Sequence, residues 1–147
     1  MTQATKDLPI GYRLPAHTFE LTRENIAAFH LTLSDVQHGR AKLGPNIHTD
    51  PEFARSVGLP DVIADGSQTS AEISRFMTEF FGEGFLRGGS LYTKYIKPVY
   101  PGYALSINLV VNDRSEEGDA VRYDMDLTCT NQEELPVIVG RATAWAR

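Results

Sequence analysis

Two features of residues 46–81 could do chemistry, a histidine and the start of a helix. His48 lies just ahead of a short predicted helix, and Asp65, Gly66 and Ser67 stand where a longer helix should begin. An imidazole can take up or release a proton near neutral pH. The first amides of a helix have no acceptor within the helix and carry partial positive charge, so they can bind a developing oxyanion. We therefore expect the site at the N-terminus of the longer helix.

The longer helix is predicted by the spacing of its apolar residues. They fall at i, i+3, i+4, i+7 and i+8, which places them on one face of a helix, and they are Ile73, Phe76, Met77, Phe80 and Phe81. A stripe this apolar has to be buried against other elements. We expect this helix to lie at the centre of the fold and to end by residues 82–84.

The region ahead of residue 48 is less regular. Residues 1–13 are polar and interrupted by proline and glycine, so they should form a loose lead-in. A short strand near 17–21 and a helix over about 23–30, with Thr22 as its N-cap, should follow. Residues 31–47 have no clean period and are predicted to form a long loop, and loops of this length are often functional.

A short helix should connect this loop to the site. Asp50 is a typical N-cap residue, and Pro51 fits the first helical position. The helix should end near Val57, with Gly58 in the left-handed conformation that closes many helices. Capping is thus the preferred explanation of Asp50.

After residue 85 the pattern changes to the alternation of strands. The strictest case is the segment 121–129, where apolar residues alternate with polar ones. Further strands are predicted at about 91–96, 105–111 and 135–146. The fold class is therefore α+β, an antiparallel sheet wrapped around a long central helix, in one domain spanning 1–147. A sheet this small leaves edges that dimerisation would cover.

Composition argues against several classes of function. The net charge is −5 without any basic block, which argues against nucleic acid as a partner. No apolar run reaches the roughly 20 residues that span a bilayer, and no secretory signal is recognisable, so we expect no membrane contact and a cytoplasmic location. The lone Cys129 suits a reducing compartment. The histidines lack metal-ligand spacing and no glycine-rich phosphate loop occurs, so we expect no metal and no cofactor.

Several segments resemble the MaoC-like hot-dog-fold dehydratases and (R)-specific enoyl-CoA hydratases. The run IHTDPEFAR at 47–55 is followed by Gly58 and by IADG at 63–66, in the order and spacing of that family. The run KPVYPG at 97–102 is similar to its K-P-V-x-P-G turn, and the last strand ends in a similar way at 139–144. The likeness covers the chain from about residue 17 onward.

The resemblance implies a hot-dog fold and a lyase that adds or removes water at an α,β-unsaturated acyl thioester. Family members use an aspartate and a histidine on a water molecule, with a backbone amide of the central helix as oxyanion donor. Matched by position, the histidine is His48 and the oxyanion glycine is Gly66. The aspartate position five residues before the histidine holds Leu43, but alignment forward from Phe29 places the acid at Asp35. An insertion at roughly 36–45 would account for the difference.

Hydration needs a base for water, an acid for the α-carbon and a stabiliser of the enolate oxygen. Asp35 and His48 would share the first two roles, and the Gly66 amide would supply the third. The thioester is expected to be acyl-CoA, or less often an acyl carrier protein conjugate, bound by a homodimer or higher homo-oligomer. Residues expected to contact the substrate are Asn46, Asp65, Ser67 and Lys97.

Other interpretations stay open at this point. Asp65 could cap the long helix or belong to the site, Gly66 could be a packing glycine, and Asp35 could brace its loop. Arg87, Lys94 and Lys97 could meet CoA phosphates. The same helix terminus could serve a hot-dog thioesterase or isomerase. The displaced aspartate instead favours a non-catalytic hot-dog subunit that binds acyl chains or completes a partner's site.

Overall fold

The computed structural model describes the backbone of residues 4–38 and 44–147, and the side chains of 4–33 and 44–147. In chain order, the elements are β1 (His17–Leu21), α1 (Arg23–His38), α2 (Pro51–Ser56), α3 (Gly66–Phe81), α4 (Glu83–Leu86), β2 (Ser90–Tyr95), β3 (Tyr103–Glu117), β4 (Ala120–Thr130) and β5 (Pro136–Ala146). None of the helices in these ranges has the length and apolarity needed to cross a membrane.

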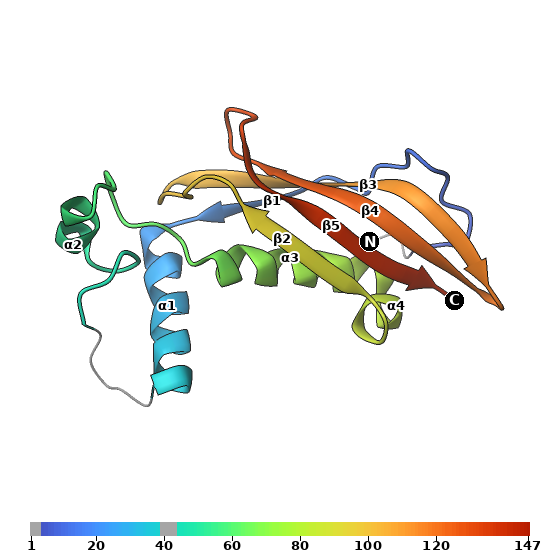
Figure 1. Ribbon diagram of the computed structural model, residues 1–147, viewed down its shortest axis with the longest axis horizontal. Coiled ribbons are helices and arrows are strands. Elements are labelled where there is room, and N and C mark those ends of the chain that lie inside the picture. Colours follow the sequence, from blue (N-terminus) through green and yellow to red (C-terminus); the bar gives the residue numbers. More distant parts are fainter. Residues whose placement is uncertain (1–3, 39–43) are drawn as a thin grey trace.

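The strands form one antiparallel sheet in the order β1-β3-β4-β5-β2. Consecutive hairpins join β3, β4 and β5, whereas β2 crosses over to pair with β5, so that Leu91 lies opposite Ala142. β2 is therefore an edge strand. Helix α3 runs along one face of the sheet (Figure 1). The predicted α+β fold, an antiparallel sheet around a long helix, is confirmed.

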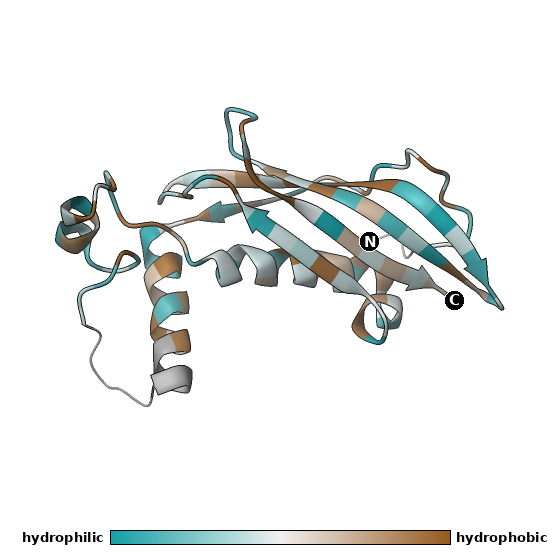
Figure 2. Cartoon of the chain, in the orientation of Figure 1, coloured by the Kyte–Doolittle hydropathy of each residue, from teal (hydrophilic) through white to brown (hydrophobic). Residues whose placement is uncertain are grey.

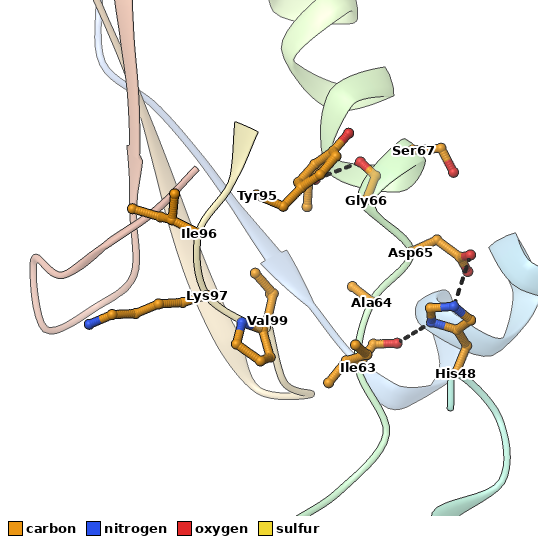
Figure 3. Close-up of a pocket in the computed structure, with 12 residues that line it drawn as sticks. His48, Ile63, Ala64, Asp65, Gly66, Ser67, Tyr95, Ile96, Lys97 and Val99 are labelled. Atoms are coloured by element: carbon orange, nitrogen blue, oxygen red, sulfur yellow. Dashed lines mark hydrogen bonds and ion pairs between the residues drawn. The ribbon is translucent and has the colours of Figure 1, made fainter. Parts of the chain in front are cut away.

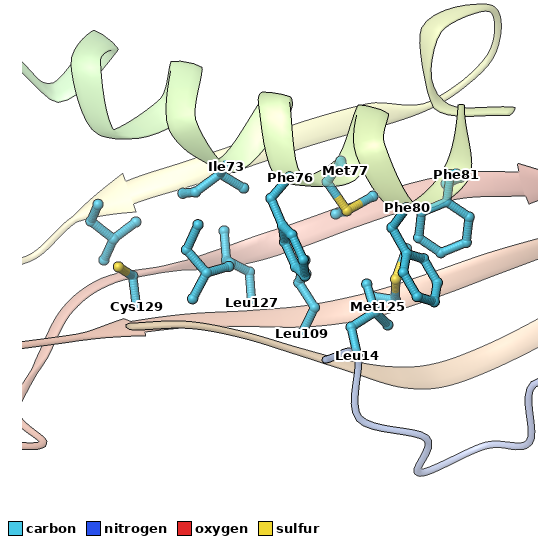
Figure 4. Close-up of a cluster of buried hydrophobic side chains, with 14 of the residues drawn as sticks. Leu14, Ile73, Phe76, Met77, Phe80, Phe81, Leu109, Met125, Leu127 and Cys129 are labelled. Carbon is cyan, nitrogen blue, oxygen red and sulfur yellow. The ribbon is translucent and has the colours of Figure 1, made fainter. Parts of the chain in front are cut away.

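The core lies between α3 and the inner face of the sheet. The stripe residues Ile73, Phe76, Met77 and Phe80 are at most 1% exposed, and Phe81 is 7% exposed. They face apolar side chains from β3 and β4 (Figure 4). Along β4 the odd-numbered residues from Val121 to Cys129 are buried, while the polar residues between them point to the other face. Figure 2 shows this alternation as brown and teal bands on the strands.

Helix α1 is longer than predicted. It continues to His38, so residues 31–38 are helical where the sequence analysis placed the start of a loop. These residues contain neither glycine nor proline, and the first helix breaker after His38 is Gly39. The helix therefore needs no strong amphipathic pattern in order to continue.

The N-terminal segment 4–14 is not the loose lead-in that its composition predicts. Leu8 and Leu14 are buried in the core cluster. The amide of Leu8 donates to the hydroxyl of Tyr123 at 3.2 Å, and that hydroxyl donates to the carbonyl of Thr5 at 2.8 Å. A few apolar residues spaced along an irregular segment are enough to anchor it, because each buried side chain removes apolar surface from water.

Candidate active site

The turn before α2 fixes the backbone of His48. Asp50 caps α2 as predicted, since its Oδ1 accepts from the amides of Glu52 and Phe53 at 3.0 Å each. The side-chain oxygen of Asn46 accepts from the amides of His48 at 2.8 Å and Thr49 at 2.9 Å. Such side-chain turns order a loop without secondary structure. His48 is thus presented by a tightly bonded loop.

The imidazole of His48 reaches the segment that leads into α3. Its Nδ1 lies 2.7 Å from the carbonyl oxygen of Ile63, and its Nε2 lies 3.3 Å from Oδ1 of Asp65 (Figure 3). A carbonyl oxygen can only accept, so Nδ1 carries a proton. The nitrogen left to exchange protons is therefore Nε2, which faces the carboxylate.

Asp65 bridges two histidines. Its second oxygen, Oδ2, lies 2.9 Å from Nδ1 of His30, and the rings of His30 and His48 are 4.7 Å apart. The three side chains are only 14–18% exposed. Although Asp65 occupies the N-cap position of α3, its side chain makes no cap hydrogen bond. Of the two roles left open for Asp65, helix capping is excluded by these contacts.

Helix α1 brings His30 to this cluster and is tied to the neighbouring segments by polar contacts. Arg23 at its start forms a two-pronged ion pair with Asp61, the shorter contact measuring 2.6 Å. The hydrogen bond from Arg23 holds the pKa of the Asp61 carboxyl below its ordinary value, despite some desolvation. Gln68 in the first turn of α3 also donates to the carbonyl of Asn25 at 3.2 Å. α1 is thereby fixed against both the approach to α3 and its first turn.

The N-terminus of α3 is open to ligand. Because the Asp65 carboxylate is engaged by histidines, the amides of the first turn are not capped by it. Tyr95 on β2 lies beside this terminus, and a Cβ added to Gly66 would come within 2.7 Å of its ring. The Tyr95 hydroxyl lies 2.5 Å from Oγ of Ser70, one turn further along α3. Glycine at 66 is thus explained in part by the packing of Tyr95.

A cavity of about 530 Å³ joins these groups. One wall is the segment around Asp65 and Gly66, and the opposite wall is the end of β2 with the residues after it (Figure 3). The walls are held together where the amide of Ala64 donates to the carbonyl of Val99 at 2.9 Å. Both His48 and Lys97 contribute to the lining, so the cavity connects an acid–base group with a cation.

The structure can now be compared with the predicted site, residue by residue. His48, Asp65, Gly66, Ser67 and Lys97 all line this one cavity. Asn46 is absent from the lining that the structure describes, and its amide group bonds within its own loop. The backbone of Asp35 lies in the last turn of α1, but its side chain lies outside the described residues, so its role stays a prediction.

The sequence analysis missed His30 and Tyr95. A usable signal for His30 was present, because it follows the buried Ile26 by four residues and so lies on the same side of α1. For Tyr95 no local pattern distinguishes it from the other aromatic residues of its strand. Only the crossover that brings β2 alongside α3 reveals it.

The cluster of His30, His48 and Asp65 could also hold a metal ion. One ligand atom from each lies within 4.8 Å of the others. Two imidazoles and a carboxylate form a common donor set for Zn²⁺ or Fe²⁺. In the described structure Nδ1 of His30 is hydrogen-bonded to Oδ2 of Asp65, and Nε2 of His48 lies 3.3 Å from Oδ1, close enough for a proton to pass between them. The donor set therefore fits either use.

Comparison with known proteins identifies related sequences and folds. Residues 18–132 match the sequence profile of the family described as MaoC like domain. No curated protein sequence matches significantly.

Solved structures share the fold at low identity. The (R)-hydratase PhaJ1 from Pseudomonas aeruginosa superposes with a TM-score of 0.71 at 20% identity, covering 96% of this chain and 88% of that one. A protein from Archaeoglobus named monoamine oxidase regulatory protein gives 0.77 at 17% identity, with 100% and 96% covered. The HadBC (3R)-hydroxyacyl-ACP dehydratase complex from Mycobacterium tuberculosis gives 0.66 at 19% identity, with 95% and 98% covered.

Proposed function

Because this chain belongs to the MaoC-like dehydratase family, we propose that it is a hydro-lyase acting on an α,β-unsaturated acyl thioester. The observation that carries the proposal is the convergence of the His48 imidazole and the N-terminus of α3 on one cavity. Acid–base groups beside an oxyanion site are what addition of water to an enoyl thioester requires.

The proposed hydration proceeds in two proton steps. A water molecule held by His48 and a carboxylate loses a proton to this pair as its oxygen bonds to the β-carbon. The electrons of the double bond move towards the thioester carbonyl as an enolate, and a proton from the pair then forms the new bond at the α-carbon. Dehydration is the reverse. The site ends with the protons it began with, so no co-reactant is needed.

The enolate oxygen would be bound by the amide of Gly66. The dipole of α3, a helix of 16 residues, adds positive potential at that point. Removing one oxyanion donor typically costs about 2.7–4 kcal/mol of barrier. The amide belongs to the backbone, so substitution of neighbouring side chains can only displace it.

We propose an acyl-CoA as the thioester, with an acyl carrier protein conjugate as the alternative. Ile63, Ala64 and Val99 offer apolar contacts to an acyl chain, and Lys97 on the cavity lining could meet a phosphate. Apolar walls with a few polar groups are typical of small-molecule sites.

We also propose that two copies associate through the edge of the sheet. β2 has no partner on its outer side among the described strands; Tyr92 within it is 68% exposed, and Ile96, directly after it, is 43% exposed. An edge with exposed apolar side chains is a preferred place for pairing between chains. Analytical ultracentrifugation of the wild-type chain checks this expectation, and a monomer at all concentrations would contradict it.

The function is tested by incubating the protein with 2-enoyl-CoA and 3-hydroxyacyl-CoA thioesters of increasing chain length. We expect loss or gain of the enoyl absorbance without release of free thiol. His48→Gln should lower kcat/KM by about 10²–10⁴-fold, the usual contribution of acid–base catalysis.

His17→Gln is a matched control, because His17 is also partly buried but bonds to Glu72 and is not part of the cavity lining. Its activity should equal that of the wild type. Thiol release would instead indicate a thioesterase. Binding of acyl-CoA without turnover would indicate a non-catalytic subunit.

A further inference from the structure

We propose that Asp65 is the carboxylate that acts with His48, and that His30 is a positioning residue that holds Asp65. The inference rests on the hydro-lyase function proposed above. It assigns the catalytic carboxylate, whose position in the family holds Leu43 in this chain. Among the residues that the structure describes, Asp65 supplies the carboxylate on the lining of the cavity that also contains His48. Its Oδ1 lies 3.3 Å from the nitrogen of His48 that is left to exchange protons.

The contacts of the His48 imidazole indicate which of its nitrogens carries a proton. Nδ1 of His48 donates to the Ile63 carbonyl, so a proton taken from water resides on Nε2 next to Asp65. The Asp65 carboxylate, 3.3 Å away, stabilises the imidazolium that forms because the two groups carry opposite charges. Asp65 and His48 can therefore keep the proton taken from water until it is transferred to the α-carbon.

His30 lies behind the carboxylate. It contacts Oδ2 of Asp65 at 2.9 Å and is not among the residues that line the cavity. A neutral imidazole with its proton on Nδ1 would donate to Oδ2 and leave Oδ1 directed at His48. His30 then acts on the reaction only through the orientation of Asp65.

Two facts about Asp65, and the position of Asp35, favour Asp65 as the carboxylate of the site. Its side chain does not cap α3, although the residue stands at the N-cap position. It is 14% exposed, so desolvation of a carboxylate is offset by two imidazole contacts rather than by water. Asp35, in contrast, follows His30 by five residues on a helix that runs away from the start of α3 (Figure 1).

The test compares two carboxylates in the assay with 2-enoyl-CoA. Asp65→Asn keeps the shape of the side chain but removes the base, and should lower kcat/KM by about 10²–10⁴-fold. Asp35→Asn, at the acid that the family resemblance suggests, should lose far less activity than Asp65→Asn, because the proposal assigns the carboxylate role to Asp65. The reverse result, a large loss in Asp35→Asn with an active Asp65→Asn, would overturn the assignment and leave the proposed function intact. Absence of turnover by the wild-type protein would contradict both the assignment of Asp65 and the proposed function.

His30 is tested by a pair of variants. An asparagine amide can place a donor where Nδ1 of histidine stands, so His30→Asn should keep kcat within a few-fold. His30→Ala should lower kcat about tenfold or more with little change in KM, because it loosens a group that acts in the transition state. Equal loss in both variants, or a loss confined to KM, would contradict a positioning role.

A measurement on the wild-type protein tests the proposal even where a variant fails to fold. Long-range ¹H–¹⁵N spectra of the imidazoles should show protons on Nδ1 of both His30 and His48. An unprotonated Nδ1 on His30 would overturn the proposal. So would activity that is lost on chelation and restored by Zn²⁺, because the three atoms would then be metal ligands.

Discussion

Helix α3 passes from a polar environment at its N-terminus into an apolar one along the rest of its length. At the start, Asp65 and its two histidine partners are each 14–18% exposed and bond to one another. About three and four turns further on, Phe76 and Phe80 are at most 1% exposed among apolar side chains. Packing of the apolar end fixes the position of the helix. The position of the groups at its polar end is thereby fixed as well. A partly buried acid–base cluster is tolerated there because His30 is hydrogen-bonded to the Asp65 carboxylate and His48 donates to the carbonyl of Ile63.

The largest effect is expected from a substitution at the apolar end of α3, which tests whether this end determines stability without determining activity. Phe76→Ala should lower the free energy of unfolding by about 3–5 kcal/mol, since a buried aromatic side chain is lost and a cavity remains. Urea unfolding measures the change, and the activity of the folded fraction should be unaltered. Glu79→Ala, an exposed position on the same helix, should change stability by less than about 0.5 kcal/mol. A full loss of activity in folded Phe76→Ala would show that the two ends are not separable.

A change at the polar end sharpens the comparison. Gly66→Ala places a Cβ within 2.7 Å of the half-exposed Tyr95 ring, so the ring must shift. We expect a loss of about 1 kcal/mol in stability, at the low end for overpacking, and a fall in kcat/KM. In a Tyr95→Ala background the stability loss should vanish.

The double-mutant cycle separates the two explanations of Gly66. If the glycine admits the thioester to the helix terminus, the fall in kcat/KM persists after Tyr95 is truncated. Recovery of activity in the double variant would assign Gly66 to packing alone.

The loop that carries His48 allows a smaller test. Asp50→Ala removes the acceptor for two amides of α2 and should cost about 1 kcal/mol of stability. Asp50→Asn keeps a capping oxygen and should cost less. Activity per folded molecule should hold in both, because Asn46 still braces His48. Thermal unfolding and the enoyl-CoA assay report the two effects, and a tenfold drop in activity would place Asp50 in the site.

The smallest expected effect concerns Glu72, which lies on α3 between the two ends. The pKa of its carboxyl is below its ordinary value of 4.5, chiefly because Arg75 donates hydrogen bonds to it, with a smaller contribution from His17. The folded state therefore binds this proton less readily than the unfolded state. The resulting stabilisation is present above about pH 4.5 and is lost as the pH falls towards the folded-state pKa.

Glu72→Gln should remove this dependence, at a cost of less than about 1 kcal/mol at neutral pH. Urea midpoints measured from pH 7 downward should fall less steeply than those of the wild type. An unchanged slope would mean that the contact with Arg75 does not stabilise the fold.

Much of the fold could be predicted because local rules determine it. The stripe on α3, the cap at Asp50 and the alternation along β4 each depend on residues a few positions apart. Gly58 likewise adopts the predicted left-handed conformation, with φ of +92°. Where the local signal was weak, the prediction was wrong. α1 continues past residue 30, and the segment 4–14 packs on the core.

The sequence by itself determined the central helix, the strands and the presence of a histidine and a glycine with the chemistry of a site. Only the tertiary structure decided which groups meet. Asp65 stands 35 positions from His30 and contacts it because α1, the loop before α3 and α3 itself are packed together. Such contacts depend on the relative placement of whole elements, which arises from burial of apolar surface across the chain and has no local pattern to reveal it.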